Sequence, residues 1–442
     1  VLFRSSSVKW TGTEEKLIED LELKELEINE KTVADPAVAV PQTLTIGDAE
    51  HKVTFKVGRL VLGSAAKVIV NPGSKLIVTG EQGVAAFVAS NIILRNENGE
   101  RSIFLFHPNV NWNKHPMATV ELITNSWYNN ADSYQWENFG LPTYGAVESI
   151  TCEETTAGVV YAEVQVYENS AWTSLGYIGG TYSIPVEKLN KPFVACNIIA
   201  FREQTAAAPK VVVTRELVGN VNASLNSYMR WTPFANSYTG EIDGAALIDM
   251  LNDAENVAPY FWIAKSSGNG SLAFDPIDED EPENVLPMQA FLLNNKGTKA
   301  EVNTLNYNDA VYAPAMGKDN NSNGAPRRRL ASAYDNTAKA RVIVTNEQGA
   351  WDIVKFRENA SNRVAEKYMN DDINIYAMAD EKAAILAAEN LENTYVGFST
   401  VKGGNFTISF ANVEGREFTL IDHETGARVE IAEGNTYEFN AD

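Results

Sequence analysis

Cysteine is nearly absent from this sequence, since Cys152 and Cys196 are the only two among 442 residues. Two cysteines exclude a disulfide framework and a cysteine-rich zinc site. Because cysteine packs readily as a small hydrophobic side chain, we expect two buried, unpaired thiols. A single disulfide between the two is the alternative.

Histidine is scarce as well, with four residues, and the common catalytic motifs are missing. We find no Gly-x-Ser-x-Gly elbow and no His-Glu-x-x-His motif, and Gly403-Gly404 lacks the Lys-Ser/Thr of a phosphate loop. The spacing of His107 and His115 suits neither a helix nor a strand, so we assign no metal site to them and the nearby Glu121. The sequence therefore predicts no metal, no cofactor and no catalytic residue.

Positive charge is in short supply, because 36 Lys and Arg stand against 58 Asp and Glu, a formal net charge of −22. This acidity argues against nucleic acid and anionic lipid as partners, since both bind to basic patches. No run of about 18 apolar residues occurs, so we predict no transmembrane helix and no membrane insertion. The chain starts at Val1 rather than Met, and we expect a mature form or a fragment.

Residues 43–95 consist of short β-branched runs separated by turns such as Asn71-Pro72-Gly73-Ser74. Strands this short cannot bury a face alone, so stacked rungs of a short β-solenoid are favoured over an antiparallel meander. The charged stretch 13–35 alternates Leu and Ile with charges, which favours a strand over a helix. Residues 1–12 match nothing downstream, and we leave them out of the fold.

Residues 102–215 and 225–295 contain an internal repeat at an offset of 95 (231 − 136). The matched pairs are Trp136 and Trp231, Phe139 and Phe234, Val166 and Phe261, and Pro192–Ala195 and Pro287–Ala290. Two copies of one β unit in a jelly-roll-like double sheet are favoured over a coincidence between Trp-rich strands. The one good helix candidate in this region is 244–252, with Asp243 as its N-cap.

Residues 327–442 alternate apolar and polar positions, most clearly at Phe406, Ile408 and Phe410. Such alternation is typical of strands with one buried and one wet face, so we predict a final β-sandwich. The stretch 422–426 is predicted to be a hairpin connection in which Gly426 takes a positive φ.

Two polar stretches, 275–284 and 317–329, are predicted to be exposed loops. Residues 319–324 match the first half of an EF-type calcium loop, but Leu330 stands where the bidentate acid belongs, so a solvated turn is favoured over calcium. The acidic run 275–283 is likewise predicted to be a solvated face, with weak calcium binding as the alternative.

Aromatic residues crowd one stretch of the chain, around 127–177. They are Trp112, Trp127, Tyr128, Tyr134, Trp136, Tyr144, Trp172 and Tyr177. Core filling is the favoured interpretation, because aromatic side chains bury large areas. The alternative is a carbohydrate-binding module in which exposed rings stack on sugars. A third reading is a glycan-directed hydrolase whose carboxylate pair the sequence does not reveal.

Several motifs resemble those of the large multi-domain secreted and surface proteins of Bacteroidetes, many of them exported by type IX secretion. The matching stretches are 68–78 (VIVNPGSKLIV), 106–121, 136–142, 229–236, 287–292, 406–410, 420–426 and 437–439. The resemblance implies a β-solenoid, a jelly-roll-like unit, a closing β-sandwich and an outer-surface location. The sorting domain usual in that group is not found before Asp442, and we expect either a truncated sequence or retention by other means.

The combined prediction is an all-β protein. We divide it into an N-terminal segment 1–37, poorly ordered or an edge strand, a short β-solenoid 38–100, a jelly-roll-like domain with the internal repeat 101–310, and a C-terminal β-sandwich 311–442. We expect a non-enzymatic structural or adhesion module, extracellular or on the outer cell surface, whose partner is a surface glycan or a protein. Its binding residues are not identified by the sequence.

Overall fold

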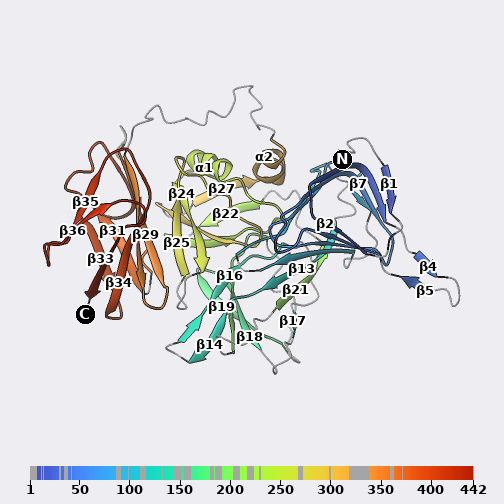
Figure 1. The fold of residues 1–442 in the computed structure, drawn as a ribbon, viewed down its shortest axis with the longest axis horizontal. Coiled ribbons are helices and arrows are strands. Elements are labelled where there is room, and N and C mark those ends of the chain that lie inside the picture. The colour runs from blue at the N-terminus through green and yellow to red at the C-terminus, as the bar shows by residue number, and fades with distance from the viewer. Residues whose placement is uncertain are drawn as a thin grey trace.

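The computed structural model describes residues 7–10, 12, 14–28, 31–33, 38–40, 42–85, 91–97, 99–109, 116–130, 133–142, 151–153, 161–179, 184, 192–202, 210–216, 223–227, 230–266, 272–297, 300–317, 338–358, 363–370 and 372–441. Strands make up 59% and helices 6% of the structure, so the all-β fold class is confirmed. The N-terminal strands and the C-terminal unit lie at opposite ends of the molecule, with the repeat sheets between them (Figure 1). No helix among the described residues is both long enough and apolar enough to cross a membrane.

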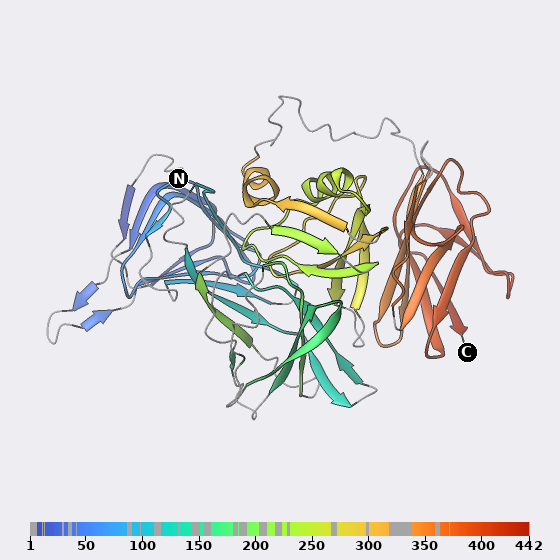
Figure 2. The same cartoon turned by 180° about the vertical axis from the view of Figure 1, so that it is seen from behind.

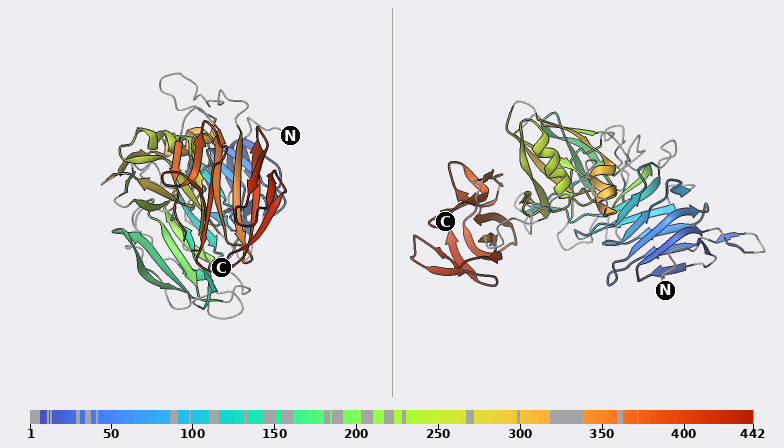
Figure 3. Two further views of the ribbon diagram at one scale, coloured as in Figure 1. Left: turned by 90° about the vertical axis from the view of Figure 1, so that its left-hand side faces the viewer. Right: turned by 90° about the horizontal axis from the view of Figure 1, so that it is seen from above.

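The N-terminal part forms two sheets of parallel strands, and the chain alternates between them; we call it the parallel coil (Figure 3, right). One sheet holds β1 (Ser7–Trp10), β3 (Leu21–Ile28), β7 (Thr54–Leu62), β9 (Lys75–Val78), β10 (Val84–Ala85) and β12 (Ile103–Phe106). The other holds β2 (Glu14–Leu17), β6 (Thr43–Ile46), β8 (Lys67–Val70), β11 (Ile92–Asn96) and β13 (Met117–Ile123), continued by antiparallel β21 (Lys210–Glu216) and β17 (Thr151–Glu153).

Buried aliphatic side chains stack from rung to rung inside the coil. Leu44 pairs with Val68, and Val68 pairs with Ile92, so these three side chains form one column. At the predicted turn, Gly73 has φ 78° and Asn71 Nδ2 donates to Gly47 O of the preceding turn at 2.7 Å. The parallel pairing excludes the antiparallel meander for these strands.

The N-terminal stretch joins the coil. The strand predicted within 13–35 is confirmed by β2 and β3, and β3 places Leu23, Leu26 and Ile28 in the core. Our exclusion of residues 1–12 is wrong for Ser7–Trp10, which form β1 and pair in parallel with β3. β1 is an edge strand, as we allowed for the segment 1–37, and its local pattern is weak because only Trp10 packs against the core.

The predicted repeat is present as two four-stranded antiparallel sheets of the same order. The offset of 95 holds for β16/β23 and β20/β26 but is 97 (263 − 166) for β18/β24, so the predicted match of Val166 with Phe261 is wrong, because Ile263 is the residue that pairs as Val166 does. The first repeat contains β16 (Glu137–Phe139), β18 (Ala162–Glu168), β19 (Ala171–Ile178) and β20 (Cys196–Ala200), in the order β16-β20-β18-β19. The second contains β23 (Trp231–Ala235), β24 (Val257–Ser266), β25 (Leu272–Ile277) and β26 (Ala290–Asn295), in the order β23-β26-β24-β25. Phe139 pairs with Cys196 in the first sheet, and the equivalent residues Phe234 and Phe291 pair in the second.

The two repeat sheets exchange equivalent contacts where they meet. Phe139 bridges Gln289, and the equivalent Phe234 bridges Val194. In the same way the Gly140 N–H donates to Met288 O at 2.8 Å, and the Ala235 N–H donates to Phe193 O at 3.2 Å. Each contact from the first sheet to the second has an equivalent contact from the second sheet to the first. Such reciprocal contacts indicate that the two sheets are related by an approximate two-fold axis.

Smaller elements complete the central region, seen from behind in Figure 2. They are the hairpin β14 (Trp127–Asn130) and β15 (Ser133–Gln135), the pair β22 (Ala223–Ser227) and β27 (Ala300–Leu305), the π-helix η4 (Asn308–Tyr312) and the short helix α2 (Ala313–Ala315). The pair β4 (Lys31–Val33) and β5 (Val38–Val40) projects instead from the parallel coil, at the end of the molecule away from the C-terminal unit (Figure 1). The predicted helix is confirmed as α1 (Gly244–Asp253), and its N-cap Asp243 accepts a hydrogen bond from Ala246 N at 2.7 Å.

The C-terminal unit has a hydrophobic core of its own. Its strands are β28 (Lys339–Asn346), β29 (Trp351–Glu358), β30 (Arg363–Glu366), β31 (Ile373–Met378), β32 (Lys382–Ala388), β33 (Val396–Thr400), β34 (Gly404–Glu414), β35 (Phe418–Ile421), β36 (Arg428–Ile431) and β37 (Thr436–Ala441). The predicted alternation is confirmed, because Phe406, Ile408 and Phe410 are all buried. The predicted hairpin turn is also present, with Gly426 at φ 76°.

Candidate functional site

Aromatic side chains gather on the outer face of the first repeat. Phe201, just after β20, stacks on Tyr161 with ring centroids 4.7 Å apart, and Tyr177 lies edge-on to Tyr161 at 5.9 Å. Tyr128 of β14 lies edge-on to Phe201 at 5.4 Å and contacts Tyr134 at 6.3 Å. Three of these rings reach solvent, since Tyr134, Tyr161 and Tyr177 are 37%, 39% and 43% exposed.

A second pair of rings lies further along the same face. Tyr167 and Trp172 are opposite each other on β18 and β19, in an edge-on contact of 5.4 Å, and Trp172 is 37% exposed. Between the two aromatic groups lie Glu163 and Gln165, whose side chains are linked by a 3.4 Å hydrogen bond. We call the whole face, from Tyr161 to Trp172, the tyrosine surface.

Strand alternation explains how the sequence builds this face. Ala162, Val164 and Val166 point inward and are buried, so the residues between them point outward. Tyr161 and Tyr167 are six positions apart on this outward set, which places them roughly 20 Å apart at about 3.3 Å per residue. The tyrosine surface is therefore an elongated strip with rings at both ends and polar side chains between them.

The equivalent face of the second repeat is covered. By their partners on β20 and β26, Gln165, opposite Asn197, corresponds to Trp262, opposite Leu292, and Glu163 corresponds to Tyr260. Tyr260 and Trp262 are 6% and 1% exposed. They pack against Ala365 of β30 and other residues of the C-terminal unit. The same face of the repeated sheet is therefore apolar and covered by the C-terminal unit in the second repeat, whereas it is polar and open to solvent in the first.

The tryptophans named from the sequence differ in how deeply they are buried. Trp127 is 4% exposed and donates from Nε1 to Gln135 at 3.3 Å, so core filling is correct for this residue. Trp136 is half-buried, and Trp231 packs edge-on against buried Trp262 at 4.6 Å. Trp112 and Tyr144 lie outside the described residues. On the tyrosine surface the exposed rings are those of tyrosines and of Trp172. The sequence did not single out Tyr161 and Phe201, because only the pairing of the strands brings these two rings together.

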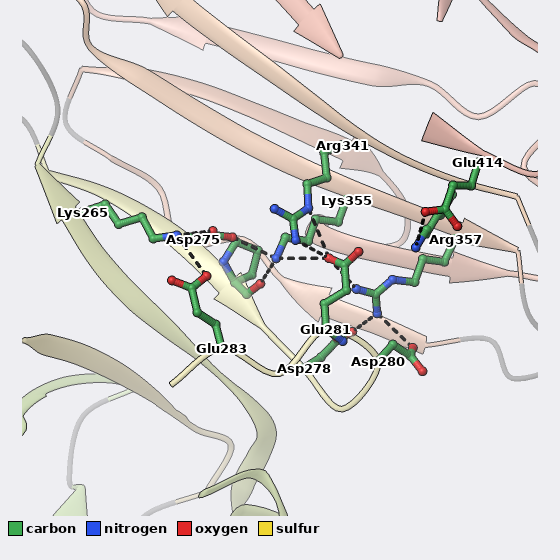
Figure 4. Close-up of polar contacts among 12 residues, drawn as sticks. Lys265, Asp275, Asp278, Asp280, Glu281, Glu283, Arg341, Lys355, Arg357 and Glu414 are labelled. Atoms are coloured by element: carbon green, nitrogen blue, oxygen red, sulfur yellow. Dashed lines mark hydrogen bonds and ion pairs between the residues drawn. The ribbon is translucent and has the colours of Figure 1, made fainter. Parts of the chain in front are cut away.

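The acidic run 275–283 is only in part the solvated loop that the sequence predicted: Glu279 and Asp280 are exposed, but the run begins in the interior and is held by cations of the C-terminal unit (Figure 4). Asp275 is 3% exposed, and its carboxylate lies 2.9 Å from Lys355 of the C-terminal unit and 2.8 Å from Lys265. Burial opposes ionisation, but the two lysines outweigh it and lower the pKa of Asp275. The prediction failed because the partner Lys355 lies far away in the sequence, on β29.

The rest of this acidic loop also binds cations of the C-terminal unit. Glu281 accepts hydrogen bonds from Arg341 at 2.7 Å and lies 3.1 Å from Arg357. Arg357 also binds Asp280 at 2.9 Å, and it bonds Asp278 as well. These carboxylates are used in holding two parts of the chain together, so weak calcium binding is not needed to explain them.

The remaining candidates from the sequence show no catalytic arrangement. His107 packs edge-on against Tyr312 at 5.5 Å, while His115 and the segment 319–324 lie outside the described residues. Cys196 is a free, buried thiol whose pKa burial raises to about 12. Cys152 lies in β17, and its side chain is outside the described set. Within the described ranges, no group of three or more His, Cys, Asp or Glu is placed to hold a metal ion.

Comparison with known proteins finds no family model that matches the sequence and no curated protein that matches it. The tyrosine surface is the described feature whose chemistry best indicates a ligand. Its rings offer flat apolar faces, and its Glu163 and Gln165 offer hydrogen-bond acceptors and donors in the same strip.

Proposed function

We propose that the protein is a non-enzymatic adhesion module that binds polysaccharide on its tyrosine surface. The observation that carries this proposal is the strip itself: exposed Tyr161 and Tyr177 at one end and exposed Trp172 beside half-buried Tyr167 at the other, with Glu163 and Gln165 between them. Pyranose sugars present C–H groups on their faces and hydroxyls around their edges. Aromatic rings pack against the C–H faces of the sugar, and carboxylate and amide groups hydrogen-bond to its hydroxyls.

The length of the strip favours a polymer over a single sugar. The ring pairs at Tyr161 and at Trp172 are separated by most of the length of β18, so a ligand that contacts both must be extended. Tyrosine suits such contacts, because it adds contact area at a low cost in conformational entropy and its hydroxyl can hydrogen-bond.

Charge favours a neutral glycan. The formal net charge of the chain is −22, and Glu163 adds a negative group within the strip, so an acidic polysaccharide would be repelled. The comparison with the second repeat supports a polar ligand too: where a protein unit covers this face the residues are Tyr260 and Trp262, and on the open face Glu163 and Gln165 stand at the equivalent positions.

We propose an extracellular or outer-surface location for the protein, in line with its resemblance to secreted Bacteroidetes proteins carried by the type IX route. Its role there would be to hold the cell or a partner protein against a glycan. The ion-paired contact between the second repeat and the C-terminal unit suits a module that bears load, because it fixes one part of the chain to the next.

A pull-down with four neutral polysaccharides, namely cellulose, chitin, arabinoxylan and mannan, tests the proposal. The wild-type protein should be retained by at least one of them. A triple variant, Tyr161→Ala, Trp172→Ala and Tyr177→Ala, should lose at least about tenfold in affinity, equivalent to about 1.4 kcal/mol. Tyr395→Ala removes an equally accessible ring, 61% exposed, from the C-terminal unit and serves as the matched control.

Retention of none of the four, or equal retention of the triple variant, would contradict the proposal. Release of soluble sugars from the retained polysaccharide would show that the protein is a hydrolase rather than an adhesion module. A hydrolase requires a second carboxyl group across the strip from Glu163.

A further inference from the structure

A cleft of about 550 Å³ lies where the parallel coil meets the two repeat sheets. Small-molecule sites in proteins commonly have volumes of about 300–1,000 Å³. Its polar lining comes from three parts of the chain: Arg101 of the coil, Glu137 and Asn138 of the first repeat, and Lys265 and Glu283 of the second. None of the exposed rings of the tyrosine surface lines it, so the cleft is a separate feature.

Arg101 and Glu137 face each other in this cleft as a buried ion pair. Their side chains are 9% and 8% exposed, and Arg101 Nη2 lies 3.9 Å from Glu137 Oε1, which is too long for a hydrogen bond. Each group is anchored from its far side. Arg101 Nε donates to Pro287 O at 3.2 Å, and Glu137 Oε2 accepts from the Asn125 N–H at 2.5 Å. The backbone thus holds the two charges apart.

A hydroxyl group fits this separation. It accepts from Arg101 Nη2 and donates to Glu137 Oε1, with both heavy-atom distances near 2.8 Å, whereas a carboxylate only accepts and an ammonium only donates. The half-buried Asn138 and Gln289 also line the cleft and add polar groups to its wall. A single water molecule could also bridge Arg101 and Glu137. The volume of the cleft and its further polar groups, however, suit a molecule with several hydroxyls.

The opposite wall of the cleft is electrically balanced. Lys265 Nζ lies 3.1 Å from Glu283 and 2.8 Å from Asp275. Because Arg101 and Glu137 also balance each other, the cleft offers no excess charge for an ionic ligand. Burial raises the pKa of Glu137, while Arg101 and the Asn125 N–H partly oppose this shift. A ligand hydroxyl would restore some of the solvation that the buried pair has lost.

We propose that this cleft is a second binding site, which takes a small, neutral, polyhydroxylated molecule of mono- or disaccharide size. The site is independent of the tyrosine surface. The ligand places one hydroxyl between Arg101 and Glu137.

Titration calorimetry with glucose, galactose, mannose, N-acetylglucosamine, cellobiose and lactose tests this site on the full chain. At least one of these sugars should bind saturably, and Glu137→Gln should weaken its binding at least tenfold. Glu163→Gln, the same substitution on the tyrosine surface, should leave this binding unchanged. Glu137→Gln also deprives Arg101 of its counter-charge and could destabilise the fold. Lys265→Met, on the opposite wall, is therefore measured as well. It leaves Asp275 with Lys355 as a partner, so no buried charge is left unpaired there.

Saturable binding that both Glu137→Gln and Lys265→Met weaken would support the cleft as the site. Binding lost only in Glu163→Gln would assign the sugar to the tyrosine surface and contradict the cleft. Absence of a saturable signal from all six sugars would also overturn the proposal, whatever the polysaccharide pull-down shows.

Discussion

Lys355 and Asp275 form an ion pair 2.9 Å long between the C-terminal unit and the second repeat, with side chains only 2% and 4% exposed. Lys355 also donates to Pro276 O, so its ammonium is hydrogen-bonded as well as paired. Burying two charges is costly, and such a pair adds little to stability beyond what a hydrophobic pair would give. Its effect is on geometry, since only one placement of the two parts satisfies both charges.

Removing one member of this pair should be strongly destabilising. Lys355→Met leaves Asp275 buried with Lys265 as its remaining cation, and we expect a loss of about 3–5 kcal/mol in the free energy of unfolding. Lys339→Met is the matched control, because Lys339 pairs with Glu414 at the surface and should contribute less than about 1 kcal/mol. Urea denaturation measures both, and a loss below about 1 kcal/mol for Lys355→Met would contradict the account.

Acid should weaken the contact between the second repeat and the C-terminal unit. Burial raises the pKa of Glu281, but Arg357, Lys355 and Arg341 outweigh it and lower the pKa from 4.5 to about 2. A carboxyl group with a lowered pKa stabilises the folded state above its unfolded pKa, and this contribution is lost as the pH falls from about 4.5 to 2. The shift corresponds to roughly 3 kcal/mol at 1.36 kcal/mol per pH unit.

Melting curves between pH 5 and pH 2 test this expectation. The stability of the wild type should fall over that range, and Glu281→Gln should show a shallower fall with a lower stability at pH 5. An equal fall in both proteins would assign the acid sensitivity to other groups.

The two-fold relation between the repeats makes a packing prediction. A Cβ added at Gly140 would lie 2.8 Å from both the Ala235 Cβ and Asn236 O, so Gly140→Ala should cost about 1–3 kcal/mol through overpacking. Ala235 is the residue equivalent to Gly140 in the second repeat. The double variant Gly140→Ala, Ala235→Gly moves the methyl group to the other copy and should recover part of the loss. Additive losses in the double variant would contradict the relation.

The buried thiol can be tested without affecting the fold. In a Cys152→Ser background, Cys196 should not react with a water-soluble disulfide reagent at pH 8, because its pKa is raised to about 12 and its sulfur is buried. It should react fully after denaturation. Rapid reaction of the native protein would show that β20 opens readily.

The sequence predicted those parts of the fold that depend on local pattern. The alternation at Phe406, Ile408 and Phe410 identified a strand with one buried face, and the Asn71–Ser74 turn marked a strand boundary in the coil. The repeat was visible because both copies keep an aromatic residue, Phe139 or Phe234, where the two sheets cross.

Contacts between distant residues could not be predicted in this way. Asp275 and Glu281 belong to an acidic run that is typical of a solvated loop, and only the fold brings Lys355 and Arg341 to them. The tyrosine surface is a mixed case. The crowding of rings around 127–177 was evident, but which of them are exposed depends on strand direction, so Trp127 proved buried and Trp172 open.

The most direct test of the central claim is a fluorescence titration of the wild type and of Trp172→Phe with soluble oligosaccharides of the polysaccharide that the pull-down retains. Stacking of a sugar on Trp172 should shift the wild-type tryptophan emission saturably, and the shift should disappear in Trp172→Phe while the pull-down with that variant weakens. A wild-type emission that never changes, or an unchanged shift in Trp172→Phe, would contradict glycan binding at the tyrosine surface.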